Sequence, residues 1–262
     1  MIDVHSHILP NFDDGAKDEE TALAMLALAF ENGTGTIVAT PHVMVNEWLP
    51  EWETVVAECD RLAQLATAQG TDITICPGAE VAMEYDILEK LEKPGPYCIN
   101  GSRYILVELP ANYIPAYADE FFFILQTRGF YPILAHPERN PELAHRPERL
   151  VEWIEKGILV QMNGTSITGK MGSRVMKFAE QLVVRRMVHC LGSDAHGLRT
   201  RRPKLTDAFE KISDLRGKAA AEAIAKQNPA KVLRGEEITI PEIAASDGGG
   251  VVSRLIRRLW KN

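Results

Sequence analysis

The sequence predicts an α/β protein, most simply a seven-stranded (β/α)7 barrel, because short apolar runs alternate with longer helical patterns along most of the chain. Repeated strand–helix units imply a parallel sheet, and seven of them suggest closure into a barrel. An open doubly wound sheet is the alternative. The length of 262 residues fits one large domain of barrel size or two small ones.

Seven short runs rich in β-branched residues read as strands. Each run is almost continuously apolar, which is the pattern of strands buried on both faces of a parallel sheet. The expected strands are residues 2–5, 36–40, 73–76, 104–108, 131–135, 158–162 and 187–191.

The segments between these runs have helical patterns. In the first, Leu23, Leu26, Ala27 and Phe30 recur at helical spacing and the pattern stops at Gly33, a residue typical of helix ends. Proline opens and glycine follows another of them, the usual asymmetry of helix ends. The expected helices are residues 18–32, 51–69, 116–128, 147–156, 206–211 and 218–226.

The composition changes after Pro241. Residues 246–250 read as a flexible Gly-rich linker, and residues 251–262 as a basic amphipathic helix. We therefore expect a barrel domain over residues 1–240 and a tail over 241–262. The tail has two interpretations, either weak contact with an anionic membrane surface or a frayed or subunit-docked terminus.

The bulk properties exclude several classes of protein. No run of 18 apolar residues is present, and the N-terminus lacks a secretory signal. The four cysteines lie far apart without a CxxC pair, so we expect a cytoplasmic protein, peripheral to the inner face of the membrane if the tail binds there. The net charge of −7 argues against nucleic acid as the main partner.

Nine residues of metal-ligand type fall at the end of an expected strand or in the loop after it. They are His5, His7, Asp14, His42, Glu80, Glu108, His136, Asp194 and His196. In a parallel barrel this edge is the catalytic rim, so nine such residues there are unlike a chance scatter. His145 and His189 remain outside the set, and we expect a surface residue and a strand residue.

This ligand set predicts a metal-dependent phosphate-ester hydrolase with two or three ions. Imidazole and carboxylate without thiolate suit divalent ions such as Mn²⁺, Zn²⁺ or Fe²⁺. The four carboxylates contribute −4, whereas three divalent ions would contribute +6, and the surplus would attract a phosphate dianion. Clustered metals also lower the pKa of a bridging water.

Two arginines are candidates for binding the phosphate. Arg139 follows His136 by three residues, and its guanidinium could fork onto phosphate oxygens. The alternative is an ion pair with Glu138 or Glu142. Arg201, which follows Asp194 and His196 together with Arg199 and Arg202, is the second candidate, and a solvated loop is its alternative.

An ordered series of motifs resembles the polymerase-and-histidinol-phosphatase (PHP) superfamily. Within it, the chain is similar to the bacterial protein-tyrosine phosphatases of capsule and exopolysaccharide operons, the CpsB/YwqE type. The resemblance covers about residues 1–240, and the tail does not match it. The matching stretches are residues 2–10, 13–15, 39–42, 77–81, 106–108, 135–140, 192–196, 228–229 and 233–236.

The resemblance implies a distorted seven-stranded PHP-type barrel with a trinuclear site favouring Mn²⁺, with Fe²⁺, Zn²⁺, Co²⁺ and Mg²⁺ as alternatives. It implies that a metal-bridging hydroxide attacks phosphotyrosine, on the tyrosine-rich tail of a bacterial tyrosine kinase that controls polysaccharide export. Arg139, and with less support Arg201, would bind the phosphate. The implied ligand sets are His5, His7, Glu80 and Asp194; Glu80, Glu108 and His136; and Asp14, His42 and His196.

Three other functions fit parts of the pattern. A small-molecule phosphatase, for example one for histidinol phosphate, would have the same metal site. An amidohydrolase also begins with an HxH pair, but it usually needs a strand-end lysine where this chain offers Glu80 and Glu108. A non-catalytic regulatory scaffold would be expected to lack a ligand, and all nine are present.

We predict that changing all four cysteines to serine leaves activity largely intact and that vanadate inhibits poorly. Cysteine-dependent tyrosine phosphatases need an arginine six residues after the nucleophile. After Cys59, Cys76, Cys98 and Cys190, that position holds Leu65, Ala82, Tyr104 and His196. The measurement is hydrolysis of a phosphotyrosine peptide, and an inactive but folded quadruple variant would contradict the metal-hydroxide mechanism.

Overall fold

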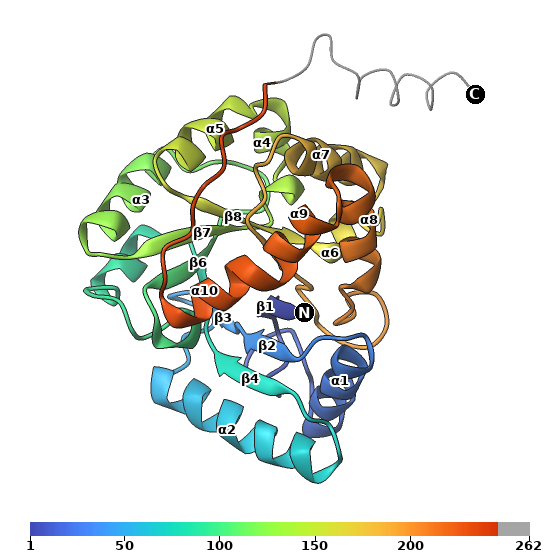
Figure 1. The fold of residues 1–262 in the computed structure, drawn as a ribbon. Helices are drawn as coiled ribbons and strands as arrows, with labels where there is room; N and C mark the ends of the chain where they lie inside the picture. The colour runs from blue at the N-terminus through green and yellow to red at the C-terminus, as the bar shows by residue number, and fades with distance from the viewer. Residues whose placement is uncertain (246–262) are drawn as a thin grey trace.

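The computed structural model describes residues 1–245 and contains, within them, nine β-strands in two parallel sheets (Figure 1). One sheet has the order β1-β2-β4 and the other β3-β5-β6-β7-β8-β9. The strands are β1 (Ile2–Ser6), β2 (Thr36–Ala39), β3 (His42–Val43), β4 (Thr74–Pro77), β5 (Glu80–Ala82), β6 (Tyr104–Glu108), β7 (Tyr131–Ala135), β8 (Leu159–Asn163) and β9 (Cys190–Gly192).

The parallel α/β architecture is confirmed, but the count of seven strands is not. All seven expected strands occur, and β3 and β5 are additional. Pro41 separates β2 from β3, since proline lacks the N–H that a sheet requires. Gly78 separates β4 from β5, and it lies so close to β2 that a Cβ there would stand 2.9 Å from Val38 Cγ1.

The two sheets are joined where β1 runs beside β9. The backbone N–H of Asp194 donates to the His5 carbonyl at 2.8 Å, and the N–H of His7 donates to the Ala195 carbonyl at 2.9 Å. A parallel bridge pairs Ser6 with Ala195. The carboxyl ends of the first and last strands therefore meet, although they are separated by almost 190 residues.

Helices cover both sheets, with α1 and α2 beside the three-stranded sheet and α3, α5, α7 and α8 around the six-stranded one (Figure 1). The expected helices are present, but the sequence interpretation missed the short α4 and α6 and the longer α7. In α7, Phe178, Ala179, Leu182 and Val183 are buried at helical spacing. The helices are α1 (Glu19–Glu31), α2 (Trp52–Ala68), α3 (Ala118–Thr127), α4 (Pro141–His145), α5 (Glu148–Glu155), α6 (Gly164–Ile167), α7 (Ser173–Val184), α8 (Thr206–Arg216), α9 (Lys218–Glu222) and α10 (Asn228–Arg234).

Helix α1 shows how local sequence positions the loop that carries part of the site. The Asp18 side chain accepts a hydrogen bond from the Thr21 N–H at 2.8 Å and thereby caps the first turn. Met25 and Leu26 are fully buried, and each contributes about 1.5–3 kcal/mol relative to an exposed side chain. The cap and the buried face fix where the loop between β1 and α1 ends.

The C-terminal helices cover the amino ends of the strands. The Asn228 side chain donates to the His189 carbonyl just before β9 at 2.9 Å, and the Tyr104 hydroxyl at the start of β6 donates to the Glu236 carbonyl at 2.7 Å. Farther on, the Ala244 N–H donates to the carbonyl of Arg185, which follows α7. The carboxyl ends of the strands lie at the opposite side.

The predicted linker and amphipathic helix over residues 246–262 lie outside the described residues. Residues 241–245 have no regular secondary structure. Among residues 1–245, none of the helices combines the length and the hydropathy that crossing a bilayer requires.

We predict that Gly192→Ala destabilises the protein by about 1–3 kcal/mol through overpacking. A Cβ at Gly192 would lie 2.6 Å from His5 Cβ and 2.7 Å from Gln161 Nε2. Gly35→Ala is the control, because nothing among the described residues lies within 4 Å of a Cβ there. Urea denaturation measures both, and equal free energies of unfolding for the two variants would refute the close approach.

Candidate metal centre

The structure brings all nine predicted ligand residues together at the carboxyl ends of the strands. Asp14 is exposed, whereas His5, His7, Glu80, His136 and Asp194 are buried. Two placements differ from the prediction, because His42 and Glu80 open the short strands β3 and β5 instead of following β2 and β4. These two residues are register partners, so they lie side by side.

The first group consists of His5, His7, Glu80 and Asp194, all buried. Glu80 Oε2 lies 3.1 Å from His5 Nε2 and 3.2 Å from His7 Nε2. Asp194 Oδ1 lies 3.6 Å and 3.5 Å from the same two nitrogens. Two imidazole nitrogens and two carboxylate oxygens thus surround one point, and this set is the one that the family resemblance implied.

The second group consists of Asp14, His42 and His196, together with His7. Asp14 Oδ1 lies 3.2 Å from His196 Nε2 and 3.7 Å from His42 Nε2. The His7 and His196 rings have centroids 3.9 Å apart. The structure therefore places the three implied residues together and adds His7 to them.

The third group is arranged around the second oxygen of Glu80. His136 Nε2 lies 2.8 Å from Glu80 Oε1 and 3.6 Å from Glu108 Oε1. His42 Nδ1 also approaches, at 3.3 Å from Glu80 Oε2 and 3.9 Å from Glu108 Oε2. Glu80 thus takes part in two groups, as expected for a bridging carboxylate, and His42 lies between the second and third groups.

The donor atoms of this centre fit divalent metal ions. His5 Nδ1 lies 3.0 Å from Gln161 Oε1 and His7 Nδ1 lies 2.7 Å from Asp13 Oδ2. Both Nδ1 atoms therefore act as donors, so in the neutral imidazoles the two Nε2 lone pairs face each other at 3.1 Å. In addition, Glu80 Oε2, His42 Nδ1 and His196 Nε2 are buried without a hydrogen-bond partner. Such converging lone pairs need a cation.

Burial, hydrogen bonds and neighbouring charges raise the pKa values of some side chains in this centre and lower those of others. Burial would lower the pKa of His7, but hydrogen bonds to Asp13 and Glu80 raise it to about 10. Burial and the charge of Glu80 raise the pKa of Glu108 to about 8. Burial and the charge of His7 lower the pKa of His196. Protons and metal ions therefore compete for this set of ligands.

Arg139 and Arg201 both contact Asp194 at the edge of the cluster. Arg139 Nη1 lies 2.8 Å from Asp194 Oδ2. Arg201 Nε donates to the Asp194 carbonyl at 3.0 Å, and its Nη2 pairs with Asp194 Oδ1. Glu142, one alternative partner for Arg139, pairs instead with Arg146 at 3.2 Å. The structure thus brings both predicted arginines to the metal centre.

Three supporting residues were missed by the sequence interpretation. Asp13 binds His7 Nδ1, and Gln161 binds His5 Nδ1. Gln161 Nε2 also donates to Asn163 Oδ1 at 2.9 Å, and Asn163 Nδ2 donates to Asp194 Oδ2 at 2.6 Å. These contacts orient the ligands. The sequence signal for Gln161 and Asn163 was their position in or directly after the expected strand 158–162. It is the only one of the seven expected strands with no predicted ligand at its end or in the loop after it.

Two of the nine predicted ligand residues have left-handed backbone conformations. His136 has a φ of 29° and Asp194 a φ of 52°. Such conformations in residues other than glycine cost about 1–3 kcal/mol and cluster at functional sites. The fold therefore holds these two side chains in position against a local backbone preference.

The two histidines outside the predicted ligand set and the four cysteines have the environments of structural residues. His145 is exposed, as expected. His189 is buried but precedes β9 by one residue, and burial lowers its pKa to about 4. All four cysteines are buried and free. Burial raises the pKa values of Cys98 and Cys190 to about 12, which is the opposite of an activated nucleophile.

Comparisons with known proteins identify the family of this chain. The family described as "Capsular polysaccharide synthesis, CpsB/CapC" matches residues 1–234. The chain is 35% identical over 201 residues to the tyrosine-protein phosphatase YwqE of Bacillus subtilis, covering 77% of this chain and 79% of YwqE. It is 30% identical over 243 residues to the tyrosine-protein phosphatase CpsB of Streptococcus pneumoniae, covering 91% of this chain and all of CpsB.

A solved structure agrees as well. A chain from the crystal structures of Bacillus subtilis YwqE and Streptococcus pneumoniae CpsB, described as unique metal-dependent tyrosine phosphatases, superposes with a TM-score of 0.87. The identity is 32%, and the match covers 94% of this chain and 100% of that one. The family resemblance stated from the motifs is confirmed: this chain belongs to the CpsB/CapC family of capsular polysaccharide synthesis proteins.

Proposed function

We propose that this chain is a metal-dependent protein-tyrosine phosphatase. The observation that carries the proposal is the convergence of nine histidine and carboxylate side chains on one rim, with buried donor atoms that face each other without hydrogen-bond partners. The matched relatives from Bacillus subtilis and Streptococcus pneumoniae, named as tyrosine-protein phosphatases, support phosphotyrosine as the substrate class.

The proposed cofactor is three divalent ions, with Mn²⁺ as the preferred metal. The first group described above would hold one ion, Glu80 with Glu108 and His136 a second, and Asp14 with His42 and His196 a third. When bound, such ions lower the pKa of a coordinated water and neutralise phosphate oxygens. Four carboxylates and five imidazoles match the ligand preference of Mn²⁺ better than that of a thiolate-seeking metal.

The chain's own residues bind and orient the substrate. Arg139 and Arg201 both contact Asp194, and their guanidinium groups can donate hydrogen bonds to the phosphate oxygens. Asp13 and Gln161 hold His7 and His5 with their Nε2 atoms directed into the cluster. The reaction breaks the phosphorus–oxygen bond to tyrosine, and water supplies the replacing oxygen. The products are tyrosine and inorganic phosphate.

The physiological substrate that we propose is the tyrosine-rich tail of a bacterial tyrosine kinase that controls polysaccharide export. The support is the family's description as capsular polysaccharide synthesis proteins. The proposal of a cytoplasmic protein rests on the four free, widely spaced cysteines. The proposal that the tail makes weak contact with the inner membrane surface rests on the sequence of residues 241–262. Unchanged liposome binding after deletion of residues 248–262 would refute the membrane contact.

We further infer that the two sheets form one distorted barrel of seven strand positions within a domain over residues 1–240. In this view β2 with β3 and β4 with β5 are interrupted strands, and the hydrogen bonds between β1 and the segment after β9 close the ring. The family match over residues 1–234 supports the domain boundary.

Metal-stripped protein should lose phosphotyrosine-peptide hydrolysis and regain it with Mn²⁺. His136→Ala removes a ligand, and Arg139→Ala removes a charged donor to the phosphate, for which we expect a loss of about 10²–10³ in kcat. The exposed Arg146→Ala is the control and should keep its activity.

The same assay should include histidinol phosphate as a competing substrate. Turnover of histidinol phosphate but of no phosphotyrosine compound would replace the proposal with a small-molecule phosphatase. Folded protein that binds Mn²⁺ yet hydrolyses neither substrate would instead favour a regulatory scaffold.

Mn²⁺ binding should release protons and strengthen with rising pH. The pKa of His7 is raised to about 10, so its imidazole is charged at neutral pH, whereas the metal binds only the neutral form. Each proton released should raise the apparent affinity up to about tenfold per pH unit below that pKa. Calorimetry in two buffers at about pH 6.5 and about pH 8.5 measures this.

Asp13→Asn is the matched variant for this measurement. It removes the carboxylate that helps to raise the pKa of His7 and should flatten the pH dependence. An affinity that is independent of pH in the unaltered protein would show that His7 is already neutral.

A further inference from the structure

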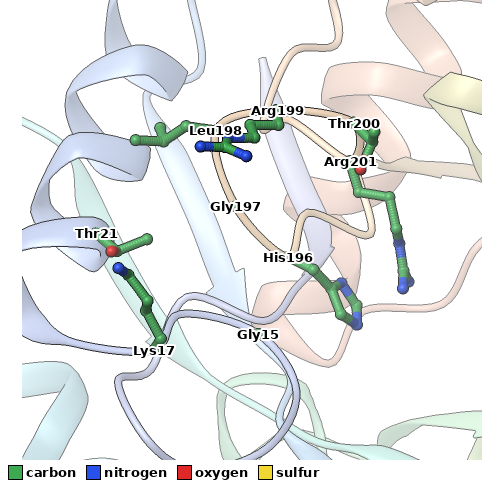
Figure 2. Close-up of a pocket in the computed structure, with 9 residues that line it drawn as sticks. All are labelled: Gly15, Lys17, Thr21, His196, Gly197, Leu198, Arg199, Thr200 and Arg201. Carbon is green, nitrogen blue, oxygen red and sulfur yellow. The ribbon is translucent and has the colours of Figure 1, made fainter.

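A pocket of about 570 Å³ lies beside the metal centre, between the loop that follows β1 and the loop that follows β9 (Figure 2). It is within the size range that binds whole small molecules. The lining residues are Gly15, Lys17, Thr21, His196, Gly197, Leu198, Arg199, Thr200 and Arg201. Three of these nine are cationic and none is acidic, although the chain as a whole has a net charge of −7.

The pocket is continuous with the proposed catalytic site. His196 lines the pocket, and its Nε2 also lies 3.2 Å from Asp14 Oδ1 in the second ligand group. Arg201 lines it as well and contacts Asp194. A substrate whose phosphate lies among the ligands therefore has neighbouring atoms directed at this pocket.

Two of the cations are available to a ligand. In the part of the chain that the structure describes, Arg199 forms no ion pair with a carboxylate. Its carbonyl accepts a hydrogen bond from Arg202 Nε at 2.7 Å, which fixes the loop instead. Lys17 Nζ lies 3.6 Å from Asp18 Oδ2, and the Lys17 side chain is 80% exposed. The other oxygen of Asp18, Oδ1, accepts the hydrogen bond that caps α1.

Lys17 and Arg199 flank the pocket from different loops. Figure 2 shows Lys17 on the segment that leads into α1 and Arg199 on the opposite loop, with the pocket between them. Leu198, which is 39% exposed, adds an apolar surface for the stem of a side chain. Two cations of different loops and one apolar contact form a site for a side chain with an anionic end.

We propose that this pocket binds an anionic side chain that neighbours the phosphotyrosine in the substrate, either a carboxylate or a second phosphotyrosine. The inference rests on the proposed tyrosine phosphatase function and adds a substrate class to it. Lys17 and Arg199 are then specificity-determining residues, and peptides with acidic neighbours are hydrolysed in preference to neutral or basic ones.

The test compares kcat/KM for four phosphotyrosine peptides that carry Glu, Ala, Lys or a second phosphotyrosine beside the target, using metal-loaded full-length protein. We expect the Glu peptide to exceed the Lys peptide by about fivefold to tenfold, a difference expected of partly exposed charges. The preference should decrease at high ionic strength. The Glu and double-phosphotyrosine peptides separate the two sources of negative charge.

The Lys17→Gln/Arg199→Gln double variant should bring the Glu-to-Lys ratio close to one. Lys204→Gln is the matched control, because it removes a charge from the same loop outside the pocket, where Lys204 pairs with Asp207 at 2.9 Å. It should keep the ratio of the unaltered protein.

Either of two results would overturn this inference and leave the proposed function standing. One is equal kcat/KM for all four peptides in an active enzyme. The other is a Glu-to-Lys ratio that the double variant leaves unchanged. Absence of turnover for every phosphotyrosine compound, with histidinol phosphate hydrolysed, would overturn the proposed function and this inference together. The two failures are therefore distinguishable.

Discussion

The buried carboxylate of Glu80 is the group on which the rest of the site depends. It is fully buried, and its two oxygens lie within 3.3 Å of nitrogens from His5, His7, His42 and His136. An isolated carboxylate at this depth would cost several kcal/mol, so the fold must surround it with positive charge. The imidazoles provide it when protonated, and metal ions provide it when the imidazoles are neutral.

The strand interruptions that altered the strand count are also what arranges this charge. Pro41 and Gly78 lie just after β2 and β4, and the chain then resumes as β3 and β5, with His42 and Glu80 as their first residues. Because His42 and Glu80 are register partners of neighbouring parallel strands, their side chains lie on the same side of the sheet, with His42 Nδ1 3.3 Å from Glu80 Oε2. The two short strands β3 and β5 are therefore part of the site.

The sequence was sufficient to predict that these nine side chains lie together, because parallel strands direct their carboxyl ends to one edge and each position follows an apolar run. It was insufficient for Gln161 and Asn163, since polar residues in a buried strand indicate a partner without identifying it. Their partners, His5 and Asp194, are set by the contact between β1 and β9 across almost the whole chain. Helix α7 has buried apolar residues at helical spacing, so the sequence contained the signal that predicts this helix.

The C-terminal segment covers the amino ends of the strands, so the described chain ends on the side opposite the candidate metal centre. Through Glu236 and Ala244, the described chain stays on the side opposite the metal rim as far as residue 245. A protein or tag fused directly after residue 245 would therefore be attached on the side opposite the rim. Immobilisation through a fusion at that position would leave the rim and its basic pocket open to a polypeptide that approaches from solution.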